Sequence, residues 1–160
     1  MQSVLNYLDN HQIEYKIFEH PAAFTCEEVE EHCSHIPGMA CKNLFIKNRK
    51  GKRFFLLVLS ATKMADIKQF GREVGQSGLT FANADNLKKI LNLEPGSVSP
   101  FGLLNDQNEI VEVYIDEEVY HAEVVNFHPN RNTATLALTG EMFRQFLNIL
   151  PHQVNVISIP

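Results

Sequence analysis

A rigid loop at residues 94–102 is the first part of this sequence with the means to do chemistry. Its sequence, EPGSVSPFG, contains two prolines and two glycines. Proline fixes φ and has no N–H, whereas glycine reaches backbone angles that other residues avoid, so the loop presents its amides and carbonyls in fixed directions. Such a loop lets a ligand approach the backbone closely. Taken alone, a plain connector is the simpler interpretation.

Two other polar features accompany this loop. Lys42-Asn43 begins an apolar run, where a charged side chain must reach an edge, a cleft or a partner, and His128-Pro129 follows another apolar run. A solvated strand end or a turn explains each feature by itself. Together, a cation, an imidazole and an amide-rich loop could hold an ester and a phosphate and place a water for hydrolysis.

The sequence contains no evident nucleophile. A Gly-x-Ser-x-Gly elbow is absent, and Ser97 and Ser99 have no base that the sequence reveals. Cys41 fits a small, half-buried strand residue better than a reactive thiolate. The phosphate-binding loop of nucleotide hydrolases and the dinucleotide fingerprint are also absent.

The sequence also predicts neither a metal nor a cofactor. Four potential ligands lie close together, namely Cys26, His32, Cys33 and His35. Their spacing matches no zinc pattern, and the histidines fit the surface of a helix.

Composition indicates one globular domain spanning 1–160, with 44% hydrophobic and 21% charged residues. No apolar run is long enough to span a bilayer, and we expect neither a secretion signal nor a membrane partner. Three cysteines without framework spacing are typical of reduced thiols, which favours a cytoplasmic location.

The net charge of −5 argues against general coating of nucleic acid, but positive charge is concentrated near Lys42. A solvated hairpin explains this cluster, and a patch that contacts phosphates is the alternative. The residues that we assign to the patch are Lys47, Arg49, Lys50 and Lys52.

The pattern of elements predicts an α+β fold around a mixed, curved and partly barrel-like sheet surrounded by helices. Hairpins mix with helices, and regular βαβ alternation is absent. Helices are predicted at 4–8, from Thr25 to before Pro37, at 65–74, from Asn83 or Asp85 to 91, and from Thr139 to 147. Strands are predicted at 15–19, 44–46, 54–59, 79–82, 110–115, 124–127, 134–138 and 154–159.

Three motifs in a fixed order connect the chain to a known family. They are KNLFIK from Lys42, PGSVSPFGLLND from Pro95, and His128-Pro129 followed by Asn132-Thr133. The chain resembles the YbaK/ProX superfamily of aminoacyl-tRNA editing domains over nearly its whole length. It is most similar to the freestanding ProX-type branch, whose members hydrolyse alanine mischarged on proline tRNA.

The resemblance implies a role for each matched residue. Lys42 corresponds to the lysine that engages the terminal adenosine and its phosphate, and Asn43 to its polar neighbour in the substrate site. His128 matches the active-site histidine. The segment that closes on the aminoacyl ester and helps to place the water corresponds to Gly96, Ser97, Val98, Ser99 and Pro100, followed by Phe101 and Gly102 at the substrate. Family members need no metal and rely on backbone groups and a ribose hydroxyl of the substrate.

The resemblance leaves specificity open. Asn130 stands where the family pattern has an apolar residue, so the shape of the pocket is in doubt. The implied activity is a trans-editing aminoacyl-tRNA hydrolase for alanyl-tRNA(Pro), with the acceptor end of tRNA as partner and with a prolyl-tRNA synthetase or an elongation factor as a further candidate partner. The alternatives are another small misacylated tRNA, such as cysteinyl-tRNA(Pro), and a non-catalytic module that binds aminoacyl-tRNA or protein.

Overall fold

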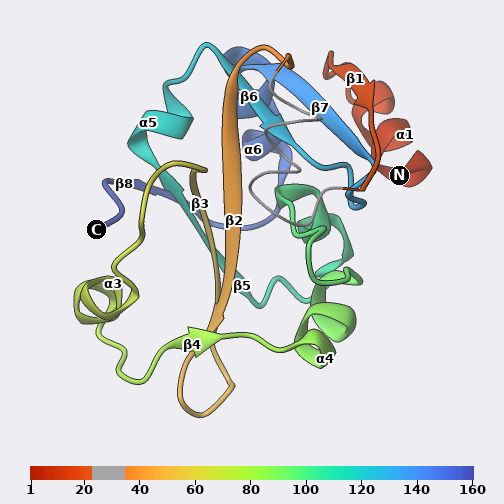
Figure 1. Cartoon of the computed structure of the whole chain (residues 1–160). Helices are drawn as coiled ribbons and strands as arrows, with labels where there is room; N and C mark the ends of the chain where they lie inside the picture. Colours follow the sequence, from red (N-terminus) through yellow and green to blue (C-terminus); the bar gives the residue numbers. More distant parts are fainter. Residues whose placement is uncertain (23–34) are drawn as a thin grey trace.

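The computed structural model describes residues 1–22 and 35–160, and its centre is a mixed sheet (Figure 1). The strands of the sheet are β1 (Lys16–Glu19), β2 (Met39–Lys47), β3 (Phe54–Ser60), β5 (Val111–Asp116), β6 (Val124–Phe127), β7 (Ala134–Thr139) and β8 (Val154–Ile157), with the short β4 (Thr80–Phe81) added at β2. Their order is β1-β7-β6-β2-β3-β5-β8, and the pairs β2–β6, β3–β5 and β5–β8 are parallel. The predicted α+β fold with a mixed sheet is confirmed.

The strand β3 is the centre of the hydrophobic core. All seven of its residues are buried, because its neighbours β2 and β5 cover both edges and helices cover both faces. Phe54, Leu56 and Val58 face one cluster, while Phe55, Leu57 and Leu59 face the other. This strand therefore holds β2 in place along almost its whole length.

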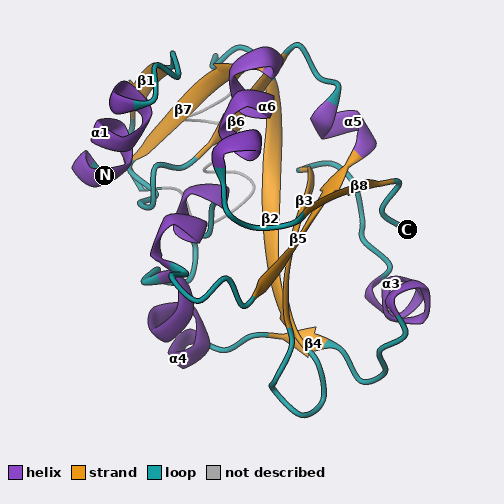
Figure 2. Ribbon diagram, turned by 180° about the vertical axis from the view of Figure 1, so that it is seen from behind, coloured by secondary structure: helices purple, strands orange, loops and turns teal. Residues whose placement is uncertain are grey.

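Helices pack on the two faces of this sheet (Figure 2). Helices α1 (Gln2–Asn10) and α6 (Gly140–Ile149) contribute to the larger core cluster, and α3 (Ile67–Val74) inserts Phe70 into the smaller one. A helical segment, α4 (Ala84–Asn86) followed by the π-helix η1 (Leu87–Leu91), begins at a capping box between Asn83 and Asn86. Thr139 caps α6 by accepting a hydrogen bond from Met142 N, as the sequence predicts.

Three features differ from the sequence-based expectation. The strand β2 begins at Met39 rather than at residue 44, because it continues through polar residues that interrupt the apolar run. Pro100, predicted as loop, opens a 3-10 helix, η2 (Pro100–Asn105), since proline presets φ and Ser99 caps the first turn. The single-turn α5 (Glu117–Tyr120) is too short for periodicity to reveal. The helix predicted from Thr25 lies outside the described residues.

The described part of the chain contains no helix with both the length and the apolar character needed to cross a membrane.

Candidate functional site

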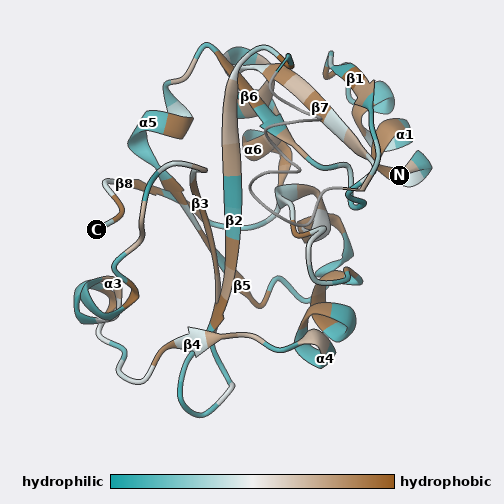
Figure 3. Ribbon diagram, in the orientation of Figure 1, coloured by the Kyte–Doolittle hydropathy of each residue, from teal (hydrophilic) through white to brown (hydrophobic). Residues whose placement is uncertain are grey.

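An open edge of β2 forms one wall of the candidate site. One edge of β2 pairs with β3 from Cys41 to Lys47, whereas the other pairs with β6 only at Met39–Ala40 and with β4 only at Ile46–Lys47. Between these two pairings, the second edge has no strand partner among the described residues. Figure 3 shows a hydrophilic band in this middle part of β2, where Lys42 and Asn43 interrupt an otherwise apolar strand.

The loop that precedes η2 reaches β2 at this open edge. Asn43 Nδ2 donates a hydrogen bond of 3.2 Å to the carbonyl of Val98. The amide orientation of Asn43 is thereby settled, because only the nitrogen can donate to a carbonyl. Its Oδ1 is buried and has no hydrogen-bond partner among the described residues. The structure therefore brings together Asn43 and Val98, two of the residues predicted for the site.

The backbone of the loop requires glycine at one position. Gly96 is exposed and has φ of 89°, in the region that β-carbon-bearing residues avoid. Ser97 N donates to the carbonyl of Glu94 at 3.1 Å, which closes the turn around Gly96. The sequence-based prediction of a stiff loop with fixed amide directions fits this geometry.

Ser99 connects the loop to the segment after β6. Its side chain is fully buried, and its Oγ accepts from Phe101 N at 3.2 Å and donates to Asn130 Oδ1 at 2.7 Å. Asn130 has φ of 63°, a left-handed conformation that asparagine tolerates better than apolar residues do. This explains the departure from the family pattern at Asn130 noted in the sequence. The hydroxyl of Ser99 thus has a structural role, with both of its hydrogen bonds made inside the protein.

The residues after Ser99 anchor the loop in the hydrophobic core. Pro100 is buried, and the ring of Phe101 is fully buried with edge contacts to Phe127 and Phe146. Gly102 lies so close to Leu93 that an added β-carbon would come within 2.7 Å of its Cδ1. Phe101 and Gly102, predicted to contact substrate, are buried here, and the contacts that the structure gives them support the loop.

His128 lies at the end of β6 with its protonation state determined by its contacts. Its Nδ1 lies 3.0 Å from the carbonyl of Ala134, and because a carbonyl only accepts, the proton is on Nδ1 and the lone pair on Nε2. Burial lowers the pKa of His128; the hydrogen bond that its ring donates to the carbonyl of Ala134 acts in the opposite direction, and the nearby His20 lowers the pKa further. His128 is therefore a neutral hydrogen-bond acceptor at neutral pH.

The register of β2 and β6 places Lys42 and His128 on the same face of the sheet. Ala40 and Asn126 are parallel partners, and Lys42 and His128 each follow two residues later. Because side chains alternate along a strand, both point to the face that Ala40 and Asn126 occupy. The hydrogen-bonded pairing of β2 and β6 ends at Ala40, so the strands are unpaired between the two side chains. Asn43 points to the opposite face and approaches the site from the side of the loop.

Two polar residues of this region were not predicted from the sequence. His20 Nε2 lies 2.8 Å from Thr135 Oγ1, and its ring centroid lies 6.2 Å from that of His128. The signal that could have revealed it is His20-Pro21, a second His-Pro pair after a strand. Asn126 is buried with no partner for its Oδ1 among the described residues, and it interrupts the apolar run of β6.

The basic residues of the hairpin lie away from this face. Lys47 is half-buried at the end of β2, and Arg49, Lys50 and Lys52 are exposed in the turn that follows. Five strand residues of about 3.3 Å each separate Lys47 from Lys42 by roughly 16 Å. Arg53, by contrast, is engaged in a two-pronged ion pair with Glu112, with N–O distances of 2.8 and 2.6 Å.

The thiol and metal alternatives find no support among the described residues. Burial, the largest of three influences, raises the pKa of Cys41 to about 12, and its Sγ donates to the carbonyl of Met39. Cys41 is thus a neutral thiol at physiological pH, as predicted. The part of the chain that the structure describes contains no group of three or more potential metal ligands; Cys26, His32 and Cys33 lie outside it.

The chemistry of the site follows from these parts. A lysine ammonium and a neutral imidazole acceptor share one sheet face, while a rigid loop and an unpartnered amide oxygen occupy the open edge beside it. This set can bind an anionic or ester-bearing ligand and polarise water without a side-chain nucleophile.

Comparisons with known proteins point in the same direction. The pattern that defines the aminoacyl-tRNA editing domain matches residues 20–146. The chain is 38% identical over 140 residues to the prolyl-tRNA editing protein ProX of Acetoanaerobium sticklandii, covering 88% of this chain and 85% of that protein. It is 31% identical to the prolyl-tRNA synthetase associated domain-containing protein 1 of Danio rerio, covering 95% and 83%. A solved structure proposed to be a trans-editing enzyme for prolyl-tRNA synthetase has the same fold, with a TM-score of 0.73 and 20% identity, and the match covers 99% of this chain and 96% of that one.

Proposed function

The chain belongs to the aminoacyl-tRNA editing domain family, and on this basis we propose that it is a trans-editing deacylase that hydrolyses alanyl-tRNA(Pro). The observation that carries the proposal is the placement of Lys42 and His128 on one sheet face, beside the open edge of β2 that the loop 96–100 contacts through Val98. The 38% identity to a prolyl-tRNA editing protein supports the choice of substrate.

The need for such an enzyme follows from the limits of binding. A synthetase site shaped for proline rejects the smaller alanine weakly, because missing methylenes are worth only about 1–3 kcal/mol of discrimination. A second site that excludes proline by size can remove the error after it is made. The product of each cycle is free alanine and intact tRNA.

The reaction needs a water, a stabilised oxyanion and a leaving hydroxyl. We assign Lys42 to the terminal phosphate and ribose, where its ammonium holds the anionic end of the substrate and orients the ester. His128 Nε2, which carries a lone pair, accepts a hydrogen bond from the attacking water. Backbone amides of the loop around Gly96 stabilise the negative charge that develops on the carbonyl oxygen. The bond between the carbonyl carbon and the ribose oxygen then breaks, and the ribose oxygen takes the proton.

Two alternatives remain distinguishable by experiment. A deacylase for cysteinyl-tRNA(Pro) would use the same residues with a different pocket, and a non-catalytic module would bind aminoacyl-tRNA without cleaving it. Single-turnover assays with alanyl-, cysteinyl-, seryl- and prolyl-tRNA(Pro) separate these functions. We expect rapid loss of alanine and no loss of proline, and binding without hydrolysis of any ester would contradict the proposal.

The tRNA partner also accounts for the basic hairpin. We assign Lys47, Arg49, Lys50 and Lys52 to phosphates of the acceptor stem. Neutralising all four should weaken binding of tRNA(Pro) and flatten the dependence of log Kd on log salt concentration. An unchanged slope would leave them as a solvated turn. A cytoplasmic location and contact with a prolyl-tRNA synthetase or an elongation factor complete the proposal.

A further inference from the structure

Among the phenylalanine and tyrosine residues that the structure describes, Phe81 alone has an exposed side chain. It is 62% exposed, and the other large hydrophobic side chains exposed there are aliphatic or methionine: Ile17, Met64, Ile110, Ile149 and Val156. The ring belongs to β4, a strand of only two residues that pairs with the C-terminal end of β2, next to the open part of its edge (Figure 1). A single exposed apolar side chain is ordinary, so the meaning of Phe81 depends on its surroundings.

The strand pairing places Phe81 on the same face as Lys42. Phe81 is the antiparallel partner of Ile46, and Ile46, Leu44 and Lys42 alternate onto one face of β2. Four residues of about 3.3 Å each separate Ile46 from Lys42, which puts the ring roughly 13 Å along the sheet from the lysine. Leu44, between them, is only half-buried.

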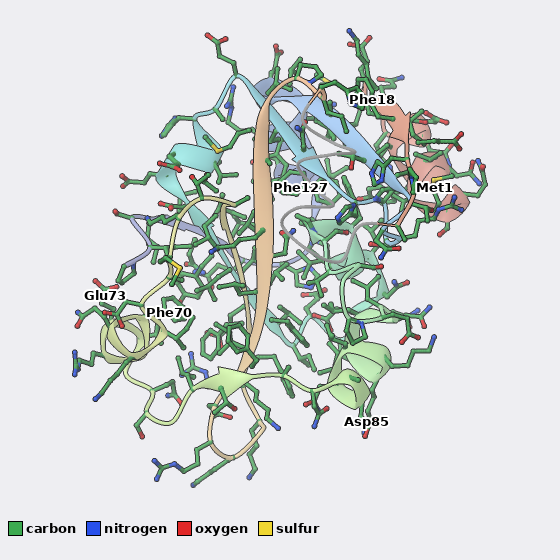
Figure 4. All side chains as sticks on the ribbon, in the orientation of Figure 1. Met1, Phe18, Phe70, Glu73, Asp85 and Phe127 are labelled. Atoms are coloured by element: carbon green, nitrogen blue, oxygen red, sulfur yellow. The ribbon has the colours of Figure 1, made fainter. Side chains whose placement is uncertain are left out.

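Positive charge continues beyond Phe81 in the same direction. The side chain of Arg49 lies over Gly78, where its Nε would come within 2.7 Å of an added β-carbon. Gly78 precedes Phe81 by three residues, so this guanidinium lies close to the start of β4. Side chains ending in nitrogen project from the β2–β3 turn next to β4 (Figure 4). Residues 47–53 carry five cations and no acid.

We propose that Phe81 is a stacking platform for an unpaired base of the tRNA 3′ end, upstream of the terminal adenosine. This inference rests on the proposed function, which places that adenosine at Lys42. A distance of about 13 Å corresponds to at most about four nucleotide steps with a stacked rise of about 3.4 Å, and to fewer if the strand is extended. The unpaired end of a tRNA, the discriminator base and CCA, supplies three such steps upstream of the terminal adenosine, which lies within this range. Arg49 then contacts a phosphate on the 5′ side of the stacked base.

The charge of the region favours a nucleic acid over an apolar protein as the occupant. An aromatic ring flanked by cations is the arrangement that binds single strands, because every base has a π-face and every linkage carries a negative charge. The chain as a whole has a net charge of −5, so this basic stretch is a local feature. An apolar protein surface would leave the adjacent guanidinium and ammonium groups without partners.

The first test uses the absence of tryptophan from the chain. In the variant Phe81→Trp, the introduced indole is the only one, and its fluorescence reports stacking directly. We expect uncharged tRNA(Pro) to quench it, and tRNA(Pro) lacking both the discriminator base and the CCA end to quench it several-fold less. Met64→Trp, at a position that is 87% exposed and away from β4, is the control and should respond to neither RNA. Equal quenching by the intact and truncated tRNA would overturn the proposal.

The second test separates stacking from catalysis. Phe81→Ala should lower kcat/KM for alanyl-tRNA(Pro) by about five- to hundredfold, the range for loss of one stacked base, whereas Phe81→Tyr should retain most of it. For 3′-O-alanyl-adenosine, which lacks the upstream nucleotides, Phe81→Ala should match the unsubstituted protein, as should Met64→Ala for both substrates. An equal fall for both substrates would make Phe81 a structural residue. If the unsubstituted protein cleaves neither substrate, the proposed function fails, while the fluorescence result still decides the stacking.

Discussion

Replacing Asn130 measures how firmly the loop 96–100 is held to the segment that carries His128. Asn130 Oδ1 accepts the hydrogen bond of Ser99 Oγ at 2.7 Å, and Ser99 is fully buried. Asn130→Gly removes the acceptor and leaves a buried hydroxyl donor without a partner, which costs about 1–3 kcal/mol of unfolding free energy. Asn130→Ala adds the strain of a β-carbon at φ of 63°, about a further 1 kcal/mol. Asn130→Asp retains an acceptor and the tolerance for this conformation.

These free energies predict an order of melting temperatures. For 160 residues, 1 kcal/mol corresponds to about 3 °C in Tm. Asn130→Gly should therefore melt roughly 3–9 °C below the unsubstituted protein, Asn130→Ala about 3 °C lower still, and Asn130→Asp close to the unsubstituted protein. Thermal unfolding followed by circular dichroism measures all three.

The same series tests the coupling to activity. If the hydrogen bond holds the loop in its working geometry, single-turnover deacylation by Asn130→Gly at 20 °C should fall on the order of tenfold, since 1.4 kcal/mol of lost positioning is a factor of ten. Asn130→Asp should restore it. A Tm for Asn130→Ala above that of Asn130→Gly would refute the backbone argument, and full activity of a destabilised Asn130→Gly would refute the link between this hydrogen bond and the site.

Lys42→Ala should fold normally yet lose at least a hundredfold in single-turnover deacylation of alanyl-tRNA(Pro) with saturating enzyme, as expected for removal of a preorganised charge, and Lys42→Arg should be partly active. Lys47→Ala should be nearly unaffected under these conditions, because a contact with an acceptor-stem phosphate contributes to binding and not to the chemical step; near-normal rates for Lys42→Ala would exclude the role. Gly96→Val should reduce turnover far more than Ser99→Ala, because valine cannot adopt φ of 89° without strain, and abolition of activity by Ser99→Ala alone would reopen a serine nucleophile. The plot of kcat/KM against pH should decline on the acidic side with an inflection below 6.5, because burial lowers the pKa of His128 and its Nε2 acts only when neutral. An unchanged acidic decline of kcat/KM in His128→Gln would assign the titration to another group. The pKa of His128 is lower in the folded protein than in the unfolded chain, so on acidification the unfolded chain binds this proton first. The folding stability that neutral His128 contributes is therefore present above pH 6.5 and lost as the pH falls through the folded pKa.

Local patterns in the sequence were sufficient for most elements and for the three polar features of the site. The apolar positions of α1, the turn between β2 and β3, and the caps at Asn83 and Thr139 act over a few neighbouring residues, so they can be read without knowledge of the fold. The same holds for the loop, because the need for glycine at residue 96 and the φ that proline imposes at residue 100 are properties of the residues themselves.

The arrangement of these features depends on contacts between residues far apart in the chain. Lys42 and His128 share a face only because β2 and β6 pair in parallel with Ala40 opposite Asn126, and a shift by one residue would turn Lys42 away. His20 joins them through β1 and β7, and the buried Asn126 becomes a candidate ligand-binding group only once its unpartnered oxygen is located. Side-chain alternation along each strand is local, but the partner and register of a strand are set by burial of the whole core. The sequence alone therefore indicates most of the residues proposed for the chemistry, whereas the tertiary structure adds His20 and Asn126 and decides which residues face one another.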